Sequence, residues 1–102
     1  QFLTPLLESW GFRCTRIERG GVENLWAEIG DANKPFLVMN GHCDVVPPGD
    51  LSQWTYPPFE PTLVGDKLYG RGAADMKGPL AALILAARDV KSSEHALPFG
   101  LA

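Results

Sequence analysis

The pattern of apolar and polar positions along the chain predicts short strands separated by turns. Residues 12–17 and 24–29 alternate enough to predict two strands, and the Gly20-Gly21 pair between them predicts a turn. The run 36–39 is continuously apolar and is bounded by loop signals. A run of this kind is typical of a strand buried on both faces, and this is what we expect here.

Two other segments predict helices. Near the start, Thr4 is a candidate N-cap, Pro5 the first helical position and Gly11 the C-terminal stop. Residues 79–90 carry apolar side chains at helical spacing, and most of the remaining positions are apolar too, so we expect a well-buried helix. Strands that alternate with helices indicate an α/β domain with a mixed sheet, and a further strand is expected to begin near Phe99.

A proline-rich stretch occupies residues 45–62, with Trp54, Tyr56 and Phe59 among its five prolines. Proline fixes φ and removes a hydrogen-bond donor, so the stretch is expected to be an ordered loop without regular structure. We expect the three aromatic side chains to anchor this loop rather than to contact a substrate. Residues 67–69 then predict a short strand or turn.

Composition and charge narrow the classes of function. The 102 residues are 45% hydrophobic and 21% charged, with a formal net charge of −3, so a nucleic-acid partner is not expected. No apolar run approaches the roughly 18 residues of a membrane helix. Cys14 and Cys43 do not form a disulfide framework, and free thiols fit a cytoplasmic location.

The residues that carry chemistry begin with His42 and Asp44, directly after the apolar run 36–39. Ligand sites in open α/β sheets form beyond the carboxyl ends of strands. His42 could bind a metal through one ring nitrogen while a carboxylate such as that of Asp44 holds the proton on the other. The alternative is that the pair only stabilises a turn after the strand.

Asp75 lies in a glycine-rich loop before the second helix, where glycines let the backbone approach an ion closely. A carboxylate there could bridge two cations, or it could act near the helix N-terminus as a cap. The glycine spacing fits neither a phosphate-binding P-loop nor a dinucleotide fingerprint. Arg71 in the same loop could neutralise an acidic substrate or pair with a local carboxylate, and both readings stay open.

Two motifs taken together resemble one family closely. They are Gly41-His42-Cys43-Asp44-Val45-Val46-Pro47 and Tyr69-Gly70-Arg71-Gly72-Ala73-Ala74-Asp75-Met76-Lys77-Gly78, with Trp54 and Pro58-Phe59 between them. They resemble the co-catalytic zinc amidohydrolase and exopeptidase family, which includes aminoacylase, acetylornithine deacetylase and carboxypeptidase G type enzymes. The longer sequence around these motifs is most similar to the succinyl-diaminopimelate desuccinylase branch of the family.

The resemblance implies a site with two divalent metal ions, zinc or cobalt. It implies that His42 ligates one metal, that Asp75 bridges both, and that Asp44 is the catalytic-site carboxylate that orients His42. It also implies a cis peptide bond between Asp75 and Met76. The expected fold class is α/β, as part of a mixed-sheet zinc-peptidase-like catalytic domain.

The resemblance further implies what this sequence lacks. Residues 1–102 are expected to be the N-terminal portion of the catalytic domain, with the general-base glutamate, the other ligands and the lid and dimerisation domain beyond Ala102. These residues alone are therefore expected to be inactive.

The implied reaction is metal-dependent hydrolysis of an amide bond in a small N-acyl amino acid, with N-succinyl-LL-2,6-diaminopimelate giving succinate and LL-2,6-diaminopimelate. The implied parent enzyme is a homodimer in lysine and diaminopimelate biosynthesis. Alternatives are another N-acyl-amino-acid deacylase, a metallo-carboxypeptidase of the same family, or a non-catalytic module on a degenerate hydrolase scaffold.

Overall fold

The computed structural model describes residues 2–31, 33–35, 37–91 and 99–101. Contacts between residues divide the chain into two compact units, one formed by residues 1–41 and 83–102 and the other by residues 42–82. Among the described residues, no helix is both long and apolar enough to cross a membrane.

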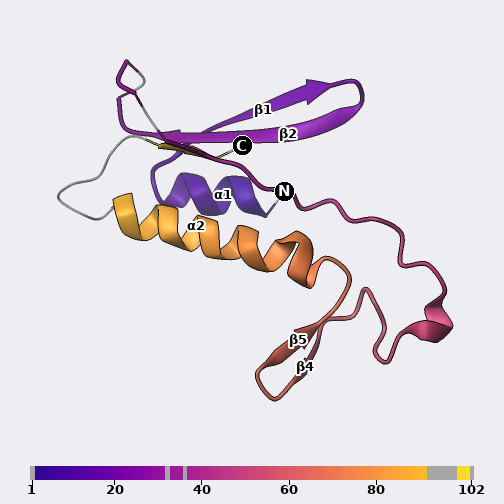
Figure 1. The fold of residues 1–102 in the computed structure, drawn as a ribbon. Helices are drawn as coiled ribbons and strands as arrows, with labels where there is room; N and C mark the ends of the chain where they lie inside the picture. Colours follow the sequence, from indigo (N-terminus) through magenta and orange to yellow (C-terminus); the bar gives the residue numbers. More distant parts are fainter. Residues whose placement is uncertain (1, 32, 36, 92–98, 102) are drawn as a thin grey trace. The chain divides into compact units, whose positions relative to one another are not determined.

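The first unit is built on a four-stranded mixed sheet. Strands β1 (Arg13–Arg19) and β2 (Val22–Ile29) form a long antiparallel hairpin (Figure 1). Strand β6 (Phe99–Leu101) pairs antiparallel with β2 and parallel with β3 (Leu37–Met39), which gives the order β1-β2-β6-β3. The structure thus confirms the predicted strands, the predicted mixed sheet and the strand near Phe99.

The turn of this hairpin is made by glycine, as expected. Gly20 and Gly21 have φ of 61° and 77°, in the left-handed region that favours glycine. Helix α1 (Leu3–Ser9) ends in the same manner, since Gly11 has φ of 85° and its N–H bonds the carbonyl of Glu8. Glycine therefore occupies both the predicted hairpin turn and the predicted end of the first helix.

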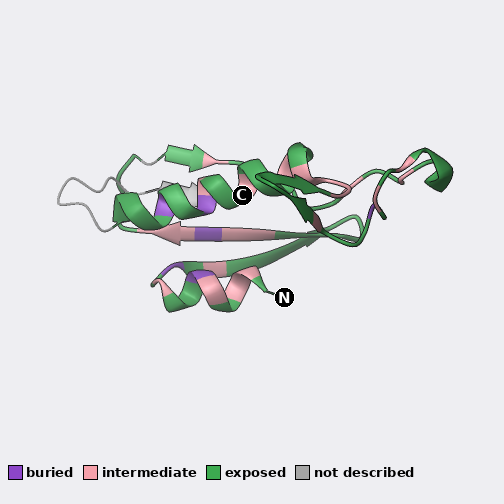
Figure 2. Ribbon diagram, turned by 90° about the horizontal axis from the view of Figure 1, so that it is seen from below, coloured by how far each residue is buried: buried purple, intermediate pink, exposed green. Residues whose placement is uncertain are grey.

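The N-terminus of α1 differs from the prediction, because Thr4 lies inside the helix and is not its N-cap. The cap position is Phe2, whose side chain makes no capping hydrogen bond. Leu7 of α1 is buried together with Phe12, just before β1, and packing of this apolar face outweighs the lost cap. The first unit also buries Ala27, Ile84 and Ala87 (Figure 2).

Two burial predictions are wrong for the described chain. Strand β3 is at the edge of the sheet beside β6, and Leu37 and Val38 are 63% and 50% exposed in the described chain. Phe36, the first residue of the predicted run, lies outside the described residues. Helix α2 (Gly78–Lys91) forms as predicted but buries only Ile84 and Ala87. The burial of a side chain depends on which other segments pack against it, and the local pattern of apolar residues does not show this. The sequence therefore predicted more burial for both segments than the structure has.

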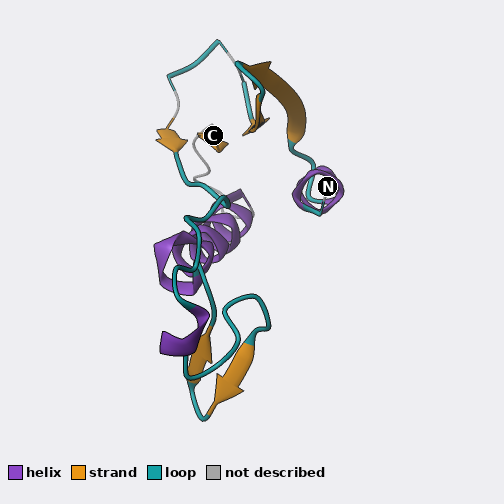
Figure 3. Cartoon of the chain, turned by 90° about the vertical axis from the view of Figure 1, so that its right-hand side faces the viewer, coloured by secondary structure: helices purple, strands orange, loops and turns teal. Residues whose placement is uncertain are grey.

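The second unit contains little regular structure besides one small hairpin. Figure 3 shows the loop character of the chain that leads into it. A 3-10 turn (Leu51–Gln53) interrupts the proline-rich loop, and β4 (Thr62–Val64) pairs antiparallel with β5 (Lys67–Tyr69). A π-helical turn at Ala73–Lys77 then leads into α2. The predicted strand at 67–69 is confirmed, and its partner β4 was not predicted.

Candidate metal centre

His42 follows β3 on an extended segment, and both of its ring nitrogens have a polar neighbour. Nδ1 lies 3.1 Å from the backbone carbonyl oxygen of Asp44 and 3.3 Å from Asp44 Oδ1. The expected carboxylate is therefore beside the ring, but the nearest acceptor is a backbone carbonyl that the sequence motif did not reveal. A carbonyl can only accept, so this contact is a hydrogen bond when Nδ1 carries the proton, and a neutral ring in that tautomer has its lone pair on Nε2.

Asp75 is presented to His42 by an unusual backbone. Within the π-helical turn Asp75 is not helical, with φ of −129° and ψ of 97°, and the Asp75–Met76 peptide bond is cis, as expected. Its Oδ1 lies 3.2 Å from His42 Nε2. In the described part of the chain, the carboxylate thus contacts the imidazole rather than a backbone N–H of α2, which disfavours the helix-cap reading.

The short distance between His42 Nε2 and Asp75 Oδ1 limits what can lie between them. Neutral His42 directs the Nε2 lone pair at a carboxylate oxygen, so two acceptors face each other at 3.2 Å. Two acceptors at this distance repel unless a proton or a cation lies between them. The same pair can therefore hold a proton on His42 or a metal ion.

The pKa of His42 is raised above its ordinary value. The largest cause is the hydrogen bond from the ring to the Asp44 backbone carbonyl, and the negative charges of Asp44 and Asp75 act in the same direction. The imidazole therefore lies in an environment that favours positive charge, whether that charge is a proton or a metal ion.

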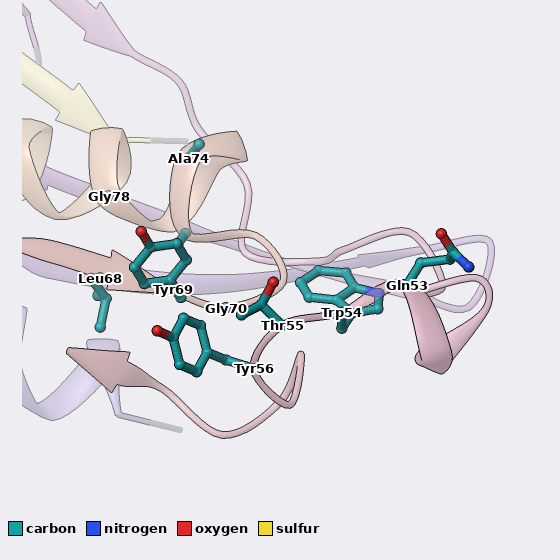
Figure 4. A pocket seen from close by; sticks show the side chains of 10 residues that line it. Gln53, Trp54, Thr55, Tyr56, Leu68, Tyr69, Gly70, Ala74 and Gly78 are labelled. Carbon is teal, nitrogen blue, oxygen red and sulfur yellow. The ribbon is translucent and has the colours of Figure 1, made fainter. Parts of the chain in front are cut away.

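A small cavity surrounds the pair. It has a volume of about 250 Å³ and is lined by His42, Asp44, Asp75 and residues of both connecting loops, namely Val45, Val46, Gly70, Arg71, Gly72 and Ala74. A larger cavity of about 560 Å³ is lined by Trp54, Tyr56 and Tyr69 among others and does not include His42 or Asp75 (Figure 4). We assign the candidate site to the smaller cavity because it contains the ionisable groups.

The spacing of the pair fits a single metal ion. Two ligand atoms bound about 2.1 Å from one tetrahedral zinc ion lie about 3.4 Å apart, and His42 Nε2 and Asp75 Oδ1 are 3.2 Å apart. The described residues contain no group of three or more His, Cys, Asp or Glu side chains that could hold a metal ion. The pair thus supplies part of a ligand set and not a whole one.

Other predicted residues take clear positions. Trp54 anchors the proline-rich loop by donating from Nε1 to the carbonyl of Pro48 at 3.0 Å, and Tyr56 packs on Tyr69 with ring centroids 4.9 Å apart. Phe59 is 65% exposed, so the prediction that it anchors the loop is wrong. Arg71 stacks on Trp54 and is not ion-paired with a carboxylate among the described residues.

Comparison with known proteins identifies the family. The family model described as peptidase family M20/M25/M40 matches residues 38–101, which include His42, Asp44 and Asp75. The chain belongs to this peptidase family. Within the M20 family, it is 58% identical over 87 residues to a succinyl-diaminopimelate desuccinylase of Janthinobacterium sp. (strain Marseille), and 52% identical over 87 residues to one of Coxiella burnetii.

These matches cover most of this chain but a small part of each relative. Both alignments take in 85% of this chain and 23% of the relative, so the chain spans about a quarter of the M20 proteins it matches. Two solved structures are also similar. An M20 metallo-carboxypeptidase from Sulfolobus solfataricus has a TM-score of 0.86 and human carnosine dipeptidase 1 has 0.72, each with 30% identity over 98% of this chain. They support the α/β catalytic-domain fold.

Proposed function

We propose that this chain contributes His42, Asp44 and Asp75 to the two-metal centre of an amidohydrolase that cleaves N-succinyl-LL-2,6-diaminopimelate. The observation that carries the proposal is the approach of His42 Nε2 to Asp75 Oδ1 at 3.2 Å, with Nδ1 held by Asp44. Family membership supports hydrolysis of an amide bond. Identity of 52–58% to relatives named as desuccinylases supports the substrate.

Each residue has a separate part in this proposal. His42 would hold a cation through Nε2, and Asp44 holds the Nδ1 side of the ring and so fixes the tautomer. Asp75 would hold a cation through its carboxylate. Divalent ions such as Zn²⁺ or Co²⁺, when bound there, would supply a water molecule of lowered pKa and a Lewis acid for the scissile carbonyl.

A second candidate function is peptide hydrolysis. The two similar solved structures are named as a metallo-carboxypeptidase and a carnosine dipeptidase, and both are 30% identical to this chain. The higher identity to the desuccinylases favours the succinylated substrate.

The test uses a chimera in which this chain replaces the 87-residue matching segment of the Janthinobacterium relative. The chimera is assayed for metal binding and for release of succinate from N-succinyl-LL-2,6-diaminopimelate, beside carnosine and N-acetylated amino acids. We expect two bound Zn²⁺ or Co²⁺ ions and a preference for the succinylated substrate. The 102 residues alone are expected to show no turnover.

Three results would count against the proposal. A folded chimera that binds no divalent metal would show that these residues do not form a metal centre. A chimera that binds metal but cleaves carnosine faster than the succinylated substrate would favour the second candidate. Turnover by the 102 residues alone would show that the ligand set is complete within the chain, contrary to the proposal.

A further inference from the structure

Arg71 joins the loop that carries Asp75 to the proline-rich loop at three points. Its backbone N–H donates to the carbonyl of Pro58 at 2.7 Å, and its Nη2 donates to the carbonyl of Pro48 at 3.3 Å. Its guanidinium carbon lies 4.9 Å from the centroid of the Trp54 ring. One side chain and its own backbone thus contact Pro48, Trp54 and Pro58.

The contacts of Arg71 and Trp54 converge on a single oxygen. The Pro48 carbonyl accepts from Trp54 Nε1 at 3.0 Å as well as from Arg71 Nη2. A carbonyl oxygen has two lone pairs, so both are used and the orientation of this peptide unit is fixed. A planar guanidinium can lie on an indole face and still donate an N–H in its own plane, whereas a lysine ammonium has no flat face to stack.

The neighbouring residue makes a second connection between the same two segments. Gly72 has φ of 81°, and a Cβ placed on it would lie 2.4 Å from Val45 Cγ1. The backbone of Gly72 therefore packs directly against the Val45 side chain. Val45 and Pro48 follow His42 by three and six residues, and Gly72 and Arg71 precede Asp75 by three and four. Both connections thus lie close to the proposed ligands.

We propose that Arg71 is a positioning residue that sets the distance between His42 and Asp75. The inference rests on the proposed metal centre. Arg71 binds no cation itself. It holds Pro48 and Trp54 against the glycine-rich loop, and the stiff Val45–Pro48 segment transmits this constraint to His42.

The test is Arg71→Lys in the chimera, with Lys67→Arg on strand β5 as the matched control. Co²⁺ is titrated as the probe, and the affinity and the visible absorption spectrum of bound Co²⁺ are recorded. We expect Arg71→Lys to weaken Co²⁺ binding about 10- to 100-fold, the range for residues that orient ligands, and to change the spectrum. Lys67→Arg should leave both unchanged.

A second variant guards against a folding defect. Trp54→Phe keeps a ring for the guanidinium but removes the Nε1 donor to Pro48, so we expect a smaller loss of Co²⁺ affinity. Because the two side chains share an acceptor, the losses in the double variant should be less than additive. Near-ultraviolet circular dichroism reports whether each variant is folded.

The outcomes separate this inference from the proposed function. Absence of Co²⁺ binding in the unmodified chimera would overturn both. Normal binding by the unmodified chimera, with unchanged affinity and spectrum in folded Arg71→Lys, would overturn the positioning role alone. If Arg71→Lys does not fold, unchanged Co²⁺ affinity in folded Trp54→Phe would overturn it equally.

Discussion

His42 Nε2 and Asp75 Oδ1 lie 3.2 Å apart although the two residues are 33 positions apart in the chain. Neither side chain is buried, since the His42 and Asp75 side chains are 46% and 87% exposed. The geometry of the pair therefore depends on how the two segments that carry His42 and Asp75 are held.

Removal of either ligand is expected to weaken metal binding strongly. We predict that His42→Ala or Asp75→Asn in the chimera weakens Co²⁺ affinity by more than about 100-fold, since residues that only orient ligands account for about 10- to 100-fold. Calorimetric titration measures the loss. Asp66→Asn, in the turn between β4 and β5, is the control and should bind Co²⁺ normally. Normal binding by His42→Ala would show that the imidazole is not a ligand.

Asp44 is expected to matter less than either ligand. Its backbone carbonyl lies closer to His42 Nδ1 than its carboxylate does, at 3.1 Å against 3.3 Å. Asp44→Asn keeps that carbonyl, so we predict a loss of Co²⁺ affinity of about tenfold, with the proton still on Nδ1 in nitrogen NMR spectra. A loss as large as that of His42→Ala would instead make the carboxylate a direct ligand.

The contact between Gly72 and Val45 gives a prediction about stability. Gly72→Ala combines a positive φ with a Cβ 2.4 Å from Val45 Cγ1, whereas Gly21→Ala has a similar φ of 77° and nothing within 4 Å. We expect about 1 kcal/mol of destabilisation from the backbone at each site. Overpacking should add about 1–3 kcal/mol at Gly72 alone.

Urea unfolding followed by tryptophan fluorescence measures both variants. Adding Val45→Ala to Gly72→Ala should recover the overpacking part and leave the backbone part. Equal destabilisation by Gly72→Ala and Gly21→Ala would mean that Val45 moves aside at no cost.

Glu28 gives a prediction about pH. Hydrogen bonds from the Trp26 indole and from Arg13 lower the pKa of Glu28, with Trp26 the larger cause. A carboxyl whose pKa is lower in the folded state stabilises the fold above its unfolded pKa, about 4.3 for glutamate, and loses this contribution as pH falls through the folded value. Glu28→Gln should therefore flatten the decline of stability below about pH 4.3.

The measurement for Glu28 is the urea midpoint across the acidic range. If Glu28→Gln loses stability at acidic pH as steeply as the unmodified protein, the loss would be due to other carboxyl groups.

Local signals in the sequence predicted the elements well. Alternation along residues 12–17 and 24–29, with glycines at the turn, led to the β1–β2 hairpin because side-chain period and positive φ are properties of a few adjacent residues. The predictions of an N-cap at Thr4 and of burial at Leu37 and Val38 were wrong because both depend on tertiary packing. Strand β4 was missed because its partner and the proline-rich context decide whether so short a segment pairs.

The candidate site was only partly readable from sequence. The residue types and spacing of His42 and Asp44 suggested metal chemistry, but resemblance to a family was needed to connect them with Asp75. The role of the Asp44 carbonyl could not be predicted from sequence, because every residue has a backbone carbonyl and the residue type does not show which one accepts a hydrogen bond. The stacking of Arg71 on Trp54 could not be predicted either, because the two residues are 17 positions apart and no periodic pattern connects them.

Strand β3 has a consequence for how the chain behaves in solution. In the described residues only one of its sides is bonded, to β6, and Leu37 and Val38 stay open to solvent. An exposed edge strand of this kind has unpaired backbone N–H and C=O groups, to which a strand of another polypeptide can bond. The 102 residues in isolation should therefore associate as their concentration rises, through main-chain bonding that has nothing to do with the metal chemistry.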